Sequence, residues 1–259
     1  MTGSIHATAI VAPDAILGEG VEIGPYCVVG PGVEIGPRTR LAAHAAVHCH
    51  TRLGADNVVH SYASVGDAPQ DKKYTGEPTR LEIGDRNVIR EFVTLNRGTT
   101  KDRSVTTIGS DCLFMSYSHV AHDCQVGNQC VLANGATLGG HVVLGDWVIM
   151  GGFAAIHQFC KVGAHAFLAN NTAVTRDVPP YVMAVGGPAR PHSINSEGLK
   201  RRGFSAEQIR NLRNAYRTLY RSGLRLEEAL EQLRAAAETQ PEVRLLVDFI
   251  PQSTRSLVR

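Results

Sequence analysis

The sequence predicts a mainly β protein, in which a parallel β-helix is followed by a small α-helical C-terminal domain. The first of three observations is a large aliphatic residue at every sixth position over most of the chain, from Ile5 to Val174. A period of six fits neither an α-helix, which needs about 3.6 residues per turn, nor a single strand, which alternates every two residues. It therefore indicates a repeating unit, a hexad, that returns to the same inward direction.

The second observation is a small residue four positions after each aliphatic one, as at Ala9, Cys27 and Ala45. This residue and the next aliphatic residue are two positions apart, so strand alternation points both side chains into one core. The residue between them then faces outward. Because a narrow core has room mainly for aliphatic and small side chains, the aromatic content of only 6% agrees with this arrangement.

The third observation is the chemistry of the remaining positions. Pro13, Pro25, Pro31 and Pro37 all stand two positions after an aliphatic residue, and Gly is frequent directly after it. Both residues favour bends, so the unit is a very short strand followed by a turn. Successive coils then stack as parallel strands roughly 4.8 Å apart.

The β-helix is expected to occupy residues 1–190, with two interruptions of the repeat. The first falls at residues 71–82 and the second at residues 101–107, where the frame shifts by one. Insertions in a repeat protein become loops that project from one face, often the binding face. A charged run such as the first is usually a solvated hairpin. We nevertheless expect it to contribute to function, because a coil needs no such insertion for its stability.

Residues 191–259 are expected to form the α-helical C-terminal domain, since the hexad pattern fails at two consecutive prolines. A Ser-x-x-Gln capping box predicts the start of the first helix. The domain is expected to cap the open end of the β-helix, whose edge strands would otherwise favour aggregation. The expected helices are residues 205–223, 226–238 and 243–250.

The composition argues against several classes of protein. The 259 residues carry a formal net charge of +2, so neither nucleic acid nor an anionic membrane is indicated as a partner. The sequence contains no apolar run of about 18 residues that could span a membrane. The first residues lack the basic and apolar regions of a signal peptide. We therefore expect the protein in the cytoplasm.

The six cysteines could suggest disulfides or a metal site. Five of them take the small inward position of their hexads, which predicts core residues instead. These five are Cys27, Cys112, Cys124, Cys130 and Cys160. Cys49 falls on a corner, and the sequence assigns it no role.

Histidines gather along one predicted edge of the β-helix. His122, Gly140 and Gln158 are spaced by 18 residues, so they share one corner if three hexads close a coil. A single outward histidine is most often a solvated residue, but a cluster of four on one edge favours a functional site. The other members of the cluster are His119, His141 and His157.

Such an edge needs a second surface to become a binding site. A convex edge cannot by itself exclude water from a substrate. A second β-helix packed alongside would turn the edge into a cleft, and closed threefold symmetry would give one cleft per interface. We therefore expect a homotrimer.

Several segments outside the general repeat pattern are distinctive: residues 70–80, 119–124, 156–160 and 197–204. With these segments the chain resembles the acyl-carrier-protein-dependent UDP-N-acetylglucosamine O-acyltransferases over essentially its whole length. The resemblance implies three-sided coils that wind left-handed. It also implies transfer of an (R)-3-hydroxyacyl group from acyl carrier protein to the sugar 3-hydroxyl, the first step of lipid A synthesis, in a homotrimer without a metal or a bound cofactor.

The resemblance implies roles for individual residues. His122 matches the general base, Asp123 would fix its tautomer, and the backbone N–H of Gly140 matches the donor to the oxyanion. Asn170 falls where the acyl channel ends, often at a glycine, so its amide would shorten the channel or loosen its selection. The residues matched to substrate binding are Asp71, Lys73, His119, His141, His157, Gln158, Asn195, Glu197 and Arg201.

Three alternatives stay open at the level of sequence. A sister N-acyltransferase acts on an amine but has an extra N-terminal domain, for which a repeat that begins at Ile5 leaves no room; a 3-amino sugar as substrate is not distinguished. Zinc carbonic anhydrases also use a left-handed β-helix, and His119, His122 and His141 could be zinc ligands. A non-catalytic scaffold would show no turnover with any acyl carrier.

Overall fold

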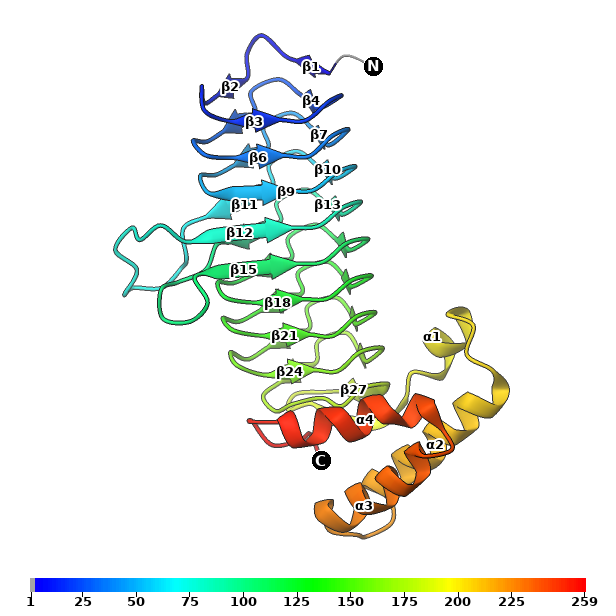
Figure 1. Ribbon diagram of the computed structural model, residues 1–259. Helices are drawn as coiled ribbons and strands as arrows, with labels where there is room; N and C mark the ends of the chain where they lie inside the picture. The colour runs from blue at the N-terminus through cyan, green and yellow to red at the C-terminus, as the bar shows by residue number, and fades with distance from the viewer. Residues whose placement is uncertain (1–2) are drawn as a thin grey trace.

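The computed structural model describes residues 3–259 as a tall three-sided column with helices packed at its C-terminal end (Figure 1). The chain crosses the near face from left to right, returns behind, and descends with each coil (Figure 1). This path is a left-handed parallel β-helix, so the expected fold class is confirmed.

The three faces of the column are three sheets, named here A, B and C. Among the described strands only β27 and β28 pair in antiparallel fashion. Sheet A has 11 strands: β1 (Ser4–Ile5), β4 (Glu22–Ile23), β7 (Arg40–Leu41), β10 (Val58–Val59), β13 (Val88–Ile89), β16 (Leu113–Phe114), β19 (Val131–Leu132), β22 (Ile149–Met150), β25 (Phe167–Leu168), β27 (Val182–Val185) and β28 (Arg190–Ile194). Sheet B has 9: β2 (Ile10–Val11), β5 (Val28–Val29), β8 (Ala46–Val47), β11 (Ser64–Asp67), β14 (Thr94–Asn96), β17 (His119–Val120), β20 (Thr137–Leu138), β23 (Ala155–Ile156) and β26 (Ala173–Val174). Sheet C has 8: β3 (Ile16–Leu17), β6 (Glu34–Ile35), β9 (Thr51–Leu53), β12 (Arg80–Ile83), β15 (Val105–Ile108), β18 (Gln125–Val126), β21 (Val143–Leu144) and β24 (Lys161–Val162).

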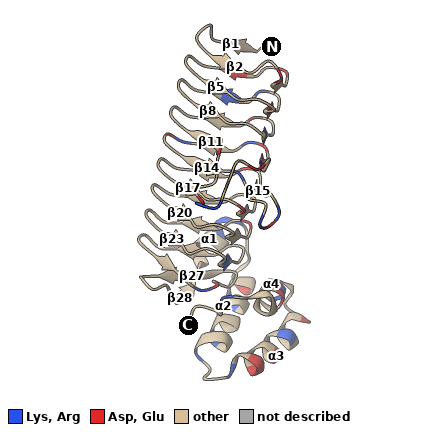
Figure 2. Cartoon of the chain, turned by 90° about the vertical axis from the view of Figure 1, so that its left-hand side faces the viewer, with Lys and Arg blue, Asp and Glu red and all other residues tan. Residues whose placement is uncertain are grey.

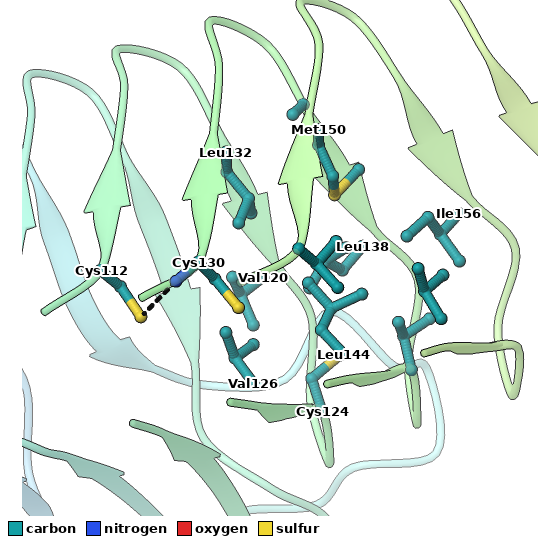
Figure 3. Packing of buried hydrophobic residues seen from close by; sticks show 14 of the residues in the cluster. Cys112, Val120, Cys124, Val126, Cys130, Leu132, Leu138, Leu144, Met150 and Ile156 are labelled. Atoms are coloured by element: carbon teal, nitrogen blue, oxygen red, sulfur yellow. Dashed lines mark hydrogen bonds between the residues drawn. The ribbon is translucent and has the colours of Figure 1, made fainter. Parts of the chain in front are cut away.

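The interior is built from the two inward positions of each hexad. Aliphatic residues such as Val59 and Leu138 and small residues such as Ala136 and Val142 are all 0% exposed. Figure 3 shows these two kinds of side chain meeting in the centre of the column. The period of six thus arises, as predicted, because two positions of each hexad point into the core.

The five cysteines predicted to be core residues are buried, with exposed fractions of 0 to 2%. Cys112 and Cys130 stack in adjacent coils, and the backbone N–H of Cys130 donates to Cys112 Sγ over 3.4 Å (Figure 3). Burial raises the pKa of Cys124 to about 12 and that of Cys160 to about 11. These two thiols therefore stay protonated at neutral pH and serve as core packing.

Each coil turns at three corners, which are named here by the sheets they join. At most corners one residue adopts the left-handed backbone region, which is uncommon outside glycine. The following residues have φ between 57° and 67°. At the A–B corner they include Tyr26, His44, Tyr62, Phe92 and Tyr117; at the B–C corner they include His50, Asp123, His141 and Phe159; at the C–A corner they include Arg38, Asp56, Trp147, His165 and Tyr181. The aromatic rings of the A–B corner stack in a ladder with centroids 4.9 to 5.2 Å apart.

Both predicted interruptions are loops that leave the column at the B–C corner, on the left of Figure 1. The long loop, residues 68–79, joins β11 to β12, and the short loop, residues 97–104, joins β14 to β15. The expected ranges also included residues 80–82 and 105–107. These belong to β12 and β15, which pair in register over four residues and so close the coil again.

The C-terminal helices largely follow their capping signals. Ser205 and Gln208 form the predicted capping box at the start of α2. The short helix α1 and the hairpin of β27 and β28 were not predicted, and β28 spans residue 190, so sheet A continues to Ile194. No helix in the described part of the chain is long and apolar enough to cross a bilayer. The helices are α1 (Ser196–Arg201), α2 (Ala206–Tyr220), α3 (Leu226–Ala237), η1 (Pro241–Val243), α4 (Arg244–Phe249) and η2 (Ile250–Gln252).

The C-terminal segment closes the last coil of the β-helix. The Asp177 carboxylate accepts hydrogen bonds from Ser253 Oγ at 2.7 Å and from the Thr254 backbone N–H at 3.0 Å. Asp177 also forms a β-bridge with Leu257. Helix α4 lies across the end of the column (Figure 1). The expected capping of the open edge is therefore confirmed.

Candidate active site

The centre of the predicted site is a histidine–carboxylate pair at the B–C corner. His122 Nδ1 lies 2.8 Å from Asp123 Oδ2. The Asp123 side chain is 0% exposed, whereas that of His122 is 17% exposed and reaches solvent. Two further donors come from Thr99 in the short loop, whose N–H and Oγ1 donate to the two Asp123 oxygens at 2.9 and 2.7 Å.

These contacts fix the protonation of the pair. Burial opposes ionisation of Asp123, but the hydrogen bonds from His122 and Thr99 outweigh it, so the pKa of this carboxyl lies below its usual value. An ionised carboxylate only accepts hydrogen bonds, so Nδ1 of His122 must carry the proton that it donates to Asp123. Nε2 then holds a lone pair, and within residues 3–259 it has no hydrogen-bond partner. His122 is thus arranged to accept a proton.

Gly140 lies directly under the His122 ring. A Cβ at position 140 would stand 2.6 Å from His122 Cε1 and 2.8 Å from Nε2, so only glycine allows this approach. The amides on either side, of Gly139 and His141, donate to Ile156 and His122 carbonyls at 2.9 and 3.0 Å. The Gly140 N–H has no such acceptor in the described chain. It remains available beside the base, where an oxyanion donor is needed.

His141 occupies the next coil of the same corner. Its ring stacks on Phe159, with centroids 4.3 Å apart and planes 11° apart, and meets the His122 ring edge-on at 5.1 Å. Nδ1 lies 3.0 Å from Asp102 Oδ2 in the short loop, and Nε2 lies 3.8 Å from Asp123 Oδ2. His122, Asp123 and His141 therefore form one contiguous group.

The long loop contributes Asp71 and Lys73. Asp71 pairs with Lys101 of the short loop, Nζ to Oδ2, over 2.6 Å, and its other oxygen accepts from the Lys73 backbone N–H at 2.9 Å. The Lys101 ammonium and this N–H hold the pKa of Asp71 below its usual value. The two loops are thereby joined above the corner.

The other predicted cleft residues flank this group. His119 faces outward on β17, and its Nδ1 lies 2.7 Å from Thr94 Oγ1. Burial lowers the pKa of His119, which favours the neutral ring. His157 and Gln158 follow β23 at the same corner, and both are exposed. The stacking of positions 122, 140 and 158 predicted from their spacing is therefore present.

Three predicted substrate contacts lie at a different corner of the column. Asn195 is 4% exposed and caps α1, and its amide donates to the carbonyl of His165 at the C–A corner over 3.0 Å. Arg201 pairs with Glu197 on the surface of α1, Nε to Oε1, at 3.1 Å. Next to them, the Arg202 guanidinium lies 5.0 Å above the ring of Trp147. One chain alone does not bring these residues to His122.

Asn170, the expected end of the acyl channel, lies next to the A–B corner. Its Oδ1 accepts from the Gly152 N–H of the preceding coil at 3.0 Å. The same type of side-chain bridge joins Asn128 and Asp146 to neighbouring coils elsewhere in the column. The amide oxygen of Asn170 is therefore satisfied within its own β-helix.

The histidine cluster contains one group of side chains that could in principle bind a metal ion. Among the described residues, ligand atoms of His122, Asp123 and His141 lie within 4.8 Å of one another. The alternative set with His119 is not brought together in this way. Since Asp123 already accepts from His122 and Thr99, hydrogen bonding accounts for this geometry.

Similarity to known proteins first defines the class. Residues 14–49 and 106–140 match the bacterial transferase hexapeptide repeat, and residues 177–258 match domain 2 of UDP-N-acetylglucosamine O-acyltransferase. The chain is therefore a hexapeptide-repeat transferase.

Individual relatives define the family. The chain is 54% identical over 256 residues to the acyl-[acyl-carrier-protein]–UDP-N-acetylglucosamine O-acyltransferase of Thiobacillus denitrificans, covering 99% of both chains. The solved UDP-N-acetylglucosamine O-acyltransferase of Moraxella catarrhalis superimposes with a TM-score of 0.96 at 44% identity, over 98% of this chain and 99% of that one. The Francisella novicida UDP-N-acetylglucosamine acyltransferase gives 0.97 at 40% identity, over 99% and 94%. The chain belongs to the UDP-N-acetylglucosamine O-acyltransferase family.

Proposed function

We propose that this protein transfers an (R)-3-hydroxyacyl group from acyl carrier protein to the 3-hydroxyl of UDP-N-acetylglucosamine, as the first step of lipid A synthesis in the cytoplasm. The observation that carries the proposal is the joint placement of a proton acceptor, His122 Nε2, and an unengaged amide, Gly140 N–H, at one point of the B–C corner. The Thiobacillus denitrificans relative is named as an acyl-[acyl-carrier-protein]–UDP-N-acetylglucosamine O-acyltransferase, and the Moraxella catarrhalis structure as a UDP-N-acetylglucosamine O-acyltransferase, which supports the proposal.

The proposed reaction is direct acyl transfer. Nε2 of His122 removes the proton of the sugar hydroxyl as its oxygen attacks the thioester carbonyl. The carbonyl oxygen becomes an oxyanion, which accepts a hydrogen bond from the Gly140 N–H. When the intermediate collapses, the C–S bond breaks, the new C–O ester bond remains, and the proton on His122 passes to the departing thiolate. Asp123 stabilises the transient imidazolium. These steps require no metal and no bound cofactor.

The function is tested with purified protein and a mixture of acyl-carrier thioesters, to which UDP-N-acetylglucosamine and its 3-amino analogue are both offered as acceptors. We expect one acylated UDP-sugar, detected by mass spectrometry, that mild alkali hydrolyses as an ester. An alkali-stable amide from a 3-amino sugar, or turnover of neither sugar, would contradict the proposal. The preferred acyl length is read from the same spectrum.

We further propose that the protein works as a homotrimer, because its three faces differ in chemistry. The outward residues of sheet C include Glu34, Arg52, Glu82 and Lys161. Sheet B has a single charged residue, Asp67, within its strands, and its face is almost wholly tan in Figure 2. The outward residues of sheet A in the middle of the column are apolar: Val58, Val88, Leu113, Val131, Ile149 and Phe167.

In such a trimer sheets A and B would be buried between the copies and sheet C would face water. This condition fixes how the three copies pack. The A–B corner, with its exposed aromatic ladder, would lie on the threefold axis, and sheet A of one copy would face sheet B of the next. The B–C corner of one copy would then approach the C–A corner of its neighbour. His122 of one chain would thus meet Glu197 and Arg201 of another, which one chain alone keeps apart.

This arrangement is tested by mixing inactive variants. We expect His122→Ala and Arg201→Ala proteins to recover activity when they are unfolded and refolded together, because each mixed trimer then has one interface with both native residues. The matched control mixes His122→Ala with Gly140→Ala. These two residues belong to the same corner of one chain, so every site stays defective. Equal recovery in both mixtures, or none in the first, would contradict the shared site.

A further inference from the structure

The short loop, residues 97–104, is firmly attached to the column. Arg97 is only 9% exposed and donates to the Gly66 carbonyl at 2.9 Å and to the Tyr74 hydroxyl of the long loop at 3.0 Å. Gly98 N–H donates to the Arg80 carbonyl at 3.0 Å, and Ser104 N–H donates to the Thr99 carbonyl at 3.2 Å. The loop can therefore hold its side chains in defined positions.

Three side chains of this loop each contact a different residue of the candidate site. Thr99 donates to Asp123, Lys101 pairs with Asp71, and Asp102 accepts from His141. The sequence assigned no role to these three loop residues. The contact between Asp102 and His141 needs an explanation, because the stack on Phe159 already holds the His141 ring in place.

The stack on Phe159 does not determine which way the His141 ring is turned about the bond that joins it to Cβ. A stacked ring can rotate by half a turn about its bond to the chain without losing the stack, and this rotation moves each nitrogen to a carbon position. Hydrogen bonding is the interaction that distinguishes the two orientations. Asp102 Oδ2, 3.0 Å from Nδ1, is such a partner, and it is contributed from 39 residues earlier in the chain.

We propose that Asp102 is a positioning residue of the acyltransferase site, which holds His141 as the Nδ1-protonated tautomer and turns Nε2 towards the His122–Asp123 pair. A carboxylate accepts and cannot donate, so the proton lies on Nδ1 and Nε2 is left for the substrate. The site then contains two histidine–carboxylate pairs of the same polarity, Asp123 with His122 and Asp102 with His141. The kinetic part of this proposal rests on the proposed function, but the tautomer does not.

Two structural facts strengthen the assignment. The His141 side chain is only 13% exposed, so its hydrogen bond competes with little water, whereas Asp102 is 40% exposed. Nε2 lies 3.8 Å from Asp123 Oδ2, beyond hydrogen-bonding distance, so among the described residues Asp102 is the carboxylate that fixes the proton of the His141 ring.

The tautomer is tested with histidine labelled with nitrogen-15. We expect the His141 ring of the native protein to show a protonated Nδ1 and an unprotonated Nε2, and the Asp102→Ala protein to show a mixture of both tautomers. The matched control is Arg103→Ala. Arg103 is the exposed neighbour of Asp102, and its side chain has no hydrogen bond or ion pair among residues 3–259. An unchanged His141 spectrum in the Asp102→Ala protein would overturn the proposal.

The kinetic test is a double-mutant cycle. Asp102→Ala is expected to lower kcat/KM roughly tenfold, in line with the loss of one charge-assisted hydrogen bond, while Arg103→Ala has no effect. In a His141→Ala background the same substitution should cost nothing, because Asp102 acts through that ring. An equal loss in both backgrounds would overturn the proposal. If the native protein turned over no acyl donor, the proposed function would fail, and the ring spectra would still decide the role of Asp102.

Discussion

His122 illustrates how a β-helix corner produces a base. The left-handed backbone at Asp123, with φ of 61°, accompanies a buried carboxylate that lies beside Nδ1 of its immediate neighbour. The same residue accepts from the short loop, so a buried charge is stabilised by three donors. The carboxylate in turn leaves Nε2 unprotonated at the surface, where an incoming hydroxyl can reach it.

Replacing the base should separate catalysis from stability. We expect His122→Ala to lower kcat by roughly 10² to 10⁴, since proton transfer by a placed side chain contributes about this much. The thermal midpoint should change little, because the ring lies outside the apolar core and the Asp123 carboxylate keeps both donors of Thr99. Steady-state kinetics and a melting curve on the same preparation provide the check. Near-native turnover would exclude His122 as the base.

Asp123 should also make stability depend on pH. Its pKa is lower in the folded chain than in the unfolded one, so its stabilisation is complete above about pH 4 and is lost as pH falls through the folded-state value. We therefore expect the urea midpoint of the native protein to fall more steeply than that of Asp123→Asn as pH decreases from neutral into this range. Parallel curves would contradict this expectation.

The residues of the site were predictable to different degrees. His122, Gly140 and Gln158 could be placed on one corner because their spacing of 18 residues matches one coil. Thr99, Lys101 and Asp102 could not, because the short loop leaves the repeat and the period no longer gives their positions. The break in the frame at this loop was the available signal, and it located the segment without its contacts.

The secondary structure elements show the same contrast between local signals and tertiary contacts. Helix α2 begins at Ser205 as predicted, because the capping box is a local interaction that its own sequence encodes. Helix α1 has only six residues and depends on the Asn195 cap and on burial of Leu199 beside α2. The β27–β28 hairpin contains several prolines and glycines, and it forms only because the last coil offers β25 as a partner.

The cap of α2 gives a test at this scale. Ser205→Ala removes the hydroxyl that accepts from the Gln208 N–H at 3.1 Å, and it should lower the free energy of unfolding by about 1 kcal/mol. Ser205→Asn, which can also cap, should lower it by less. Denaturant titration followed by circular dichroism is the measurement. Equal losses for the two variants would show that the cap contributes nothing specific.

The whole molecule is defined by its period and by the inequality of its faces. The repeat alone predicted the stacked coils and the buried cysteines. The separation of His122 from Arg201 onto different corners depends on how the C-terminal domain folds back on the column, and no local pattern encodes that path.

A charged residue on the apolar face of sheet A should prevent assembly of the proposed trimer. Leu113→Glu places a carboxylate on the outward side of sheet A and is expected to convert the proposed trimer to a monomer with little activity, because a buried unpaired charge is costly. Val143→Glu, the matched change on the outward side of sheet C, should leave both unaffected. Light scattering during size-exclusion chromatography measures the mass. Identical behaviour of the two variants would contradict the assignment of faces.

The contact between Arg202 and Trp147 gives the molecule a built-in optical probe. Trp147 is the single tryptophan of the chain, and the cation above its ring belongs to the segment that leads into the C-terminal domain. Its fluorescence therefore monitors one event, the attachment of that domain to the column. If the helices detach while the coils stay folded, the emission of Trp147 should change while the circular dichroism signal of the β-sheets stays the same.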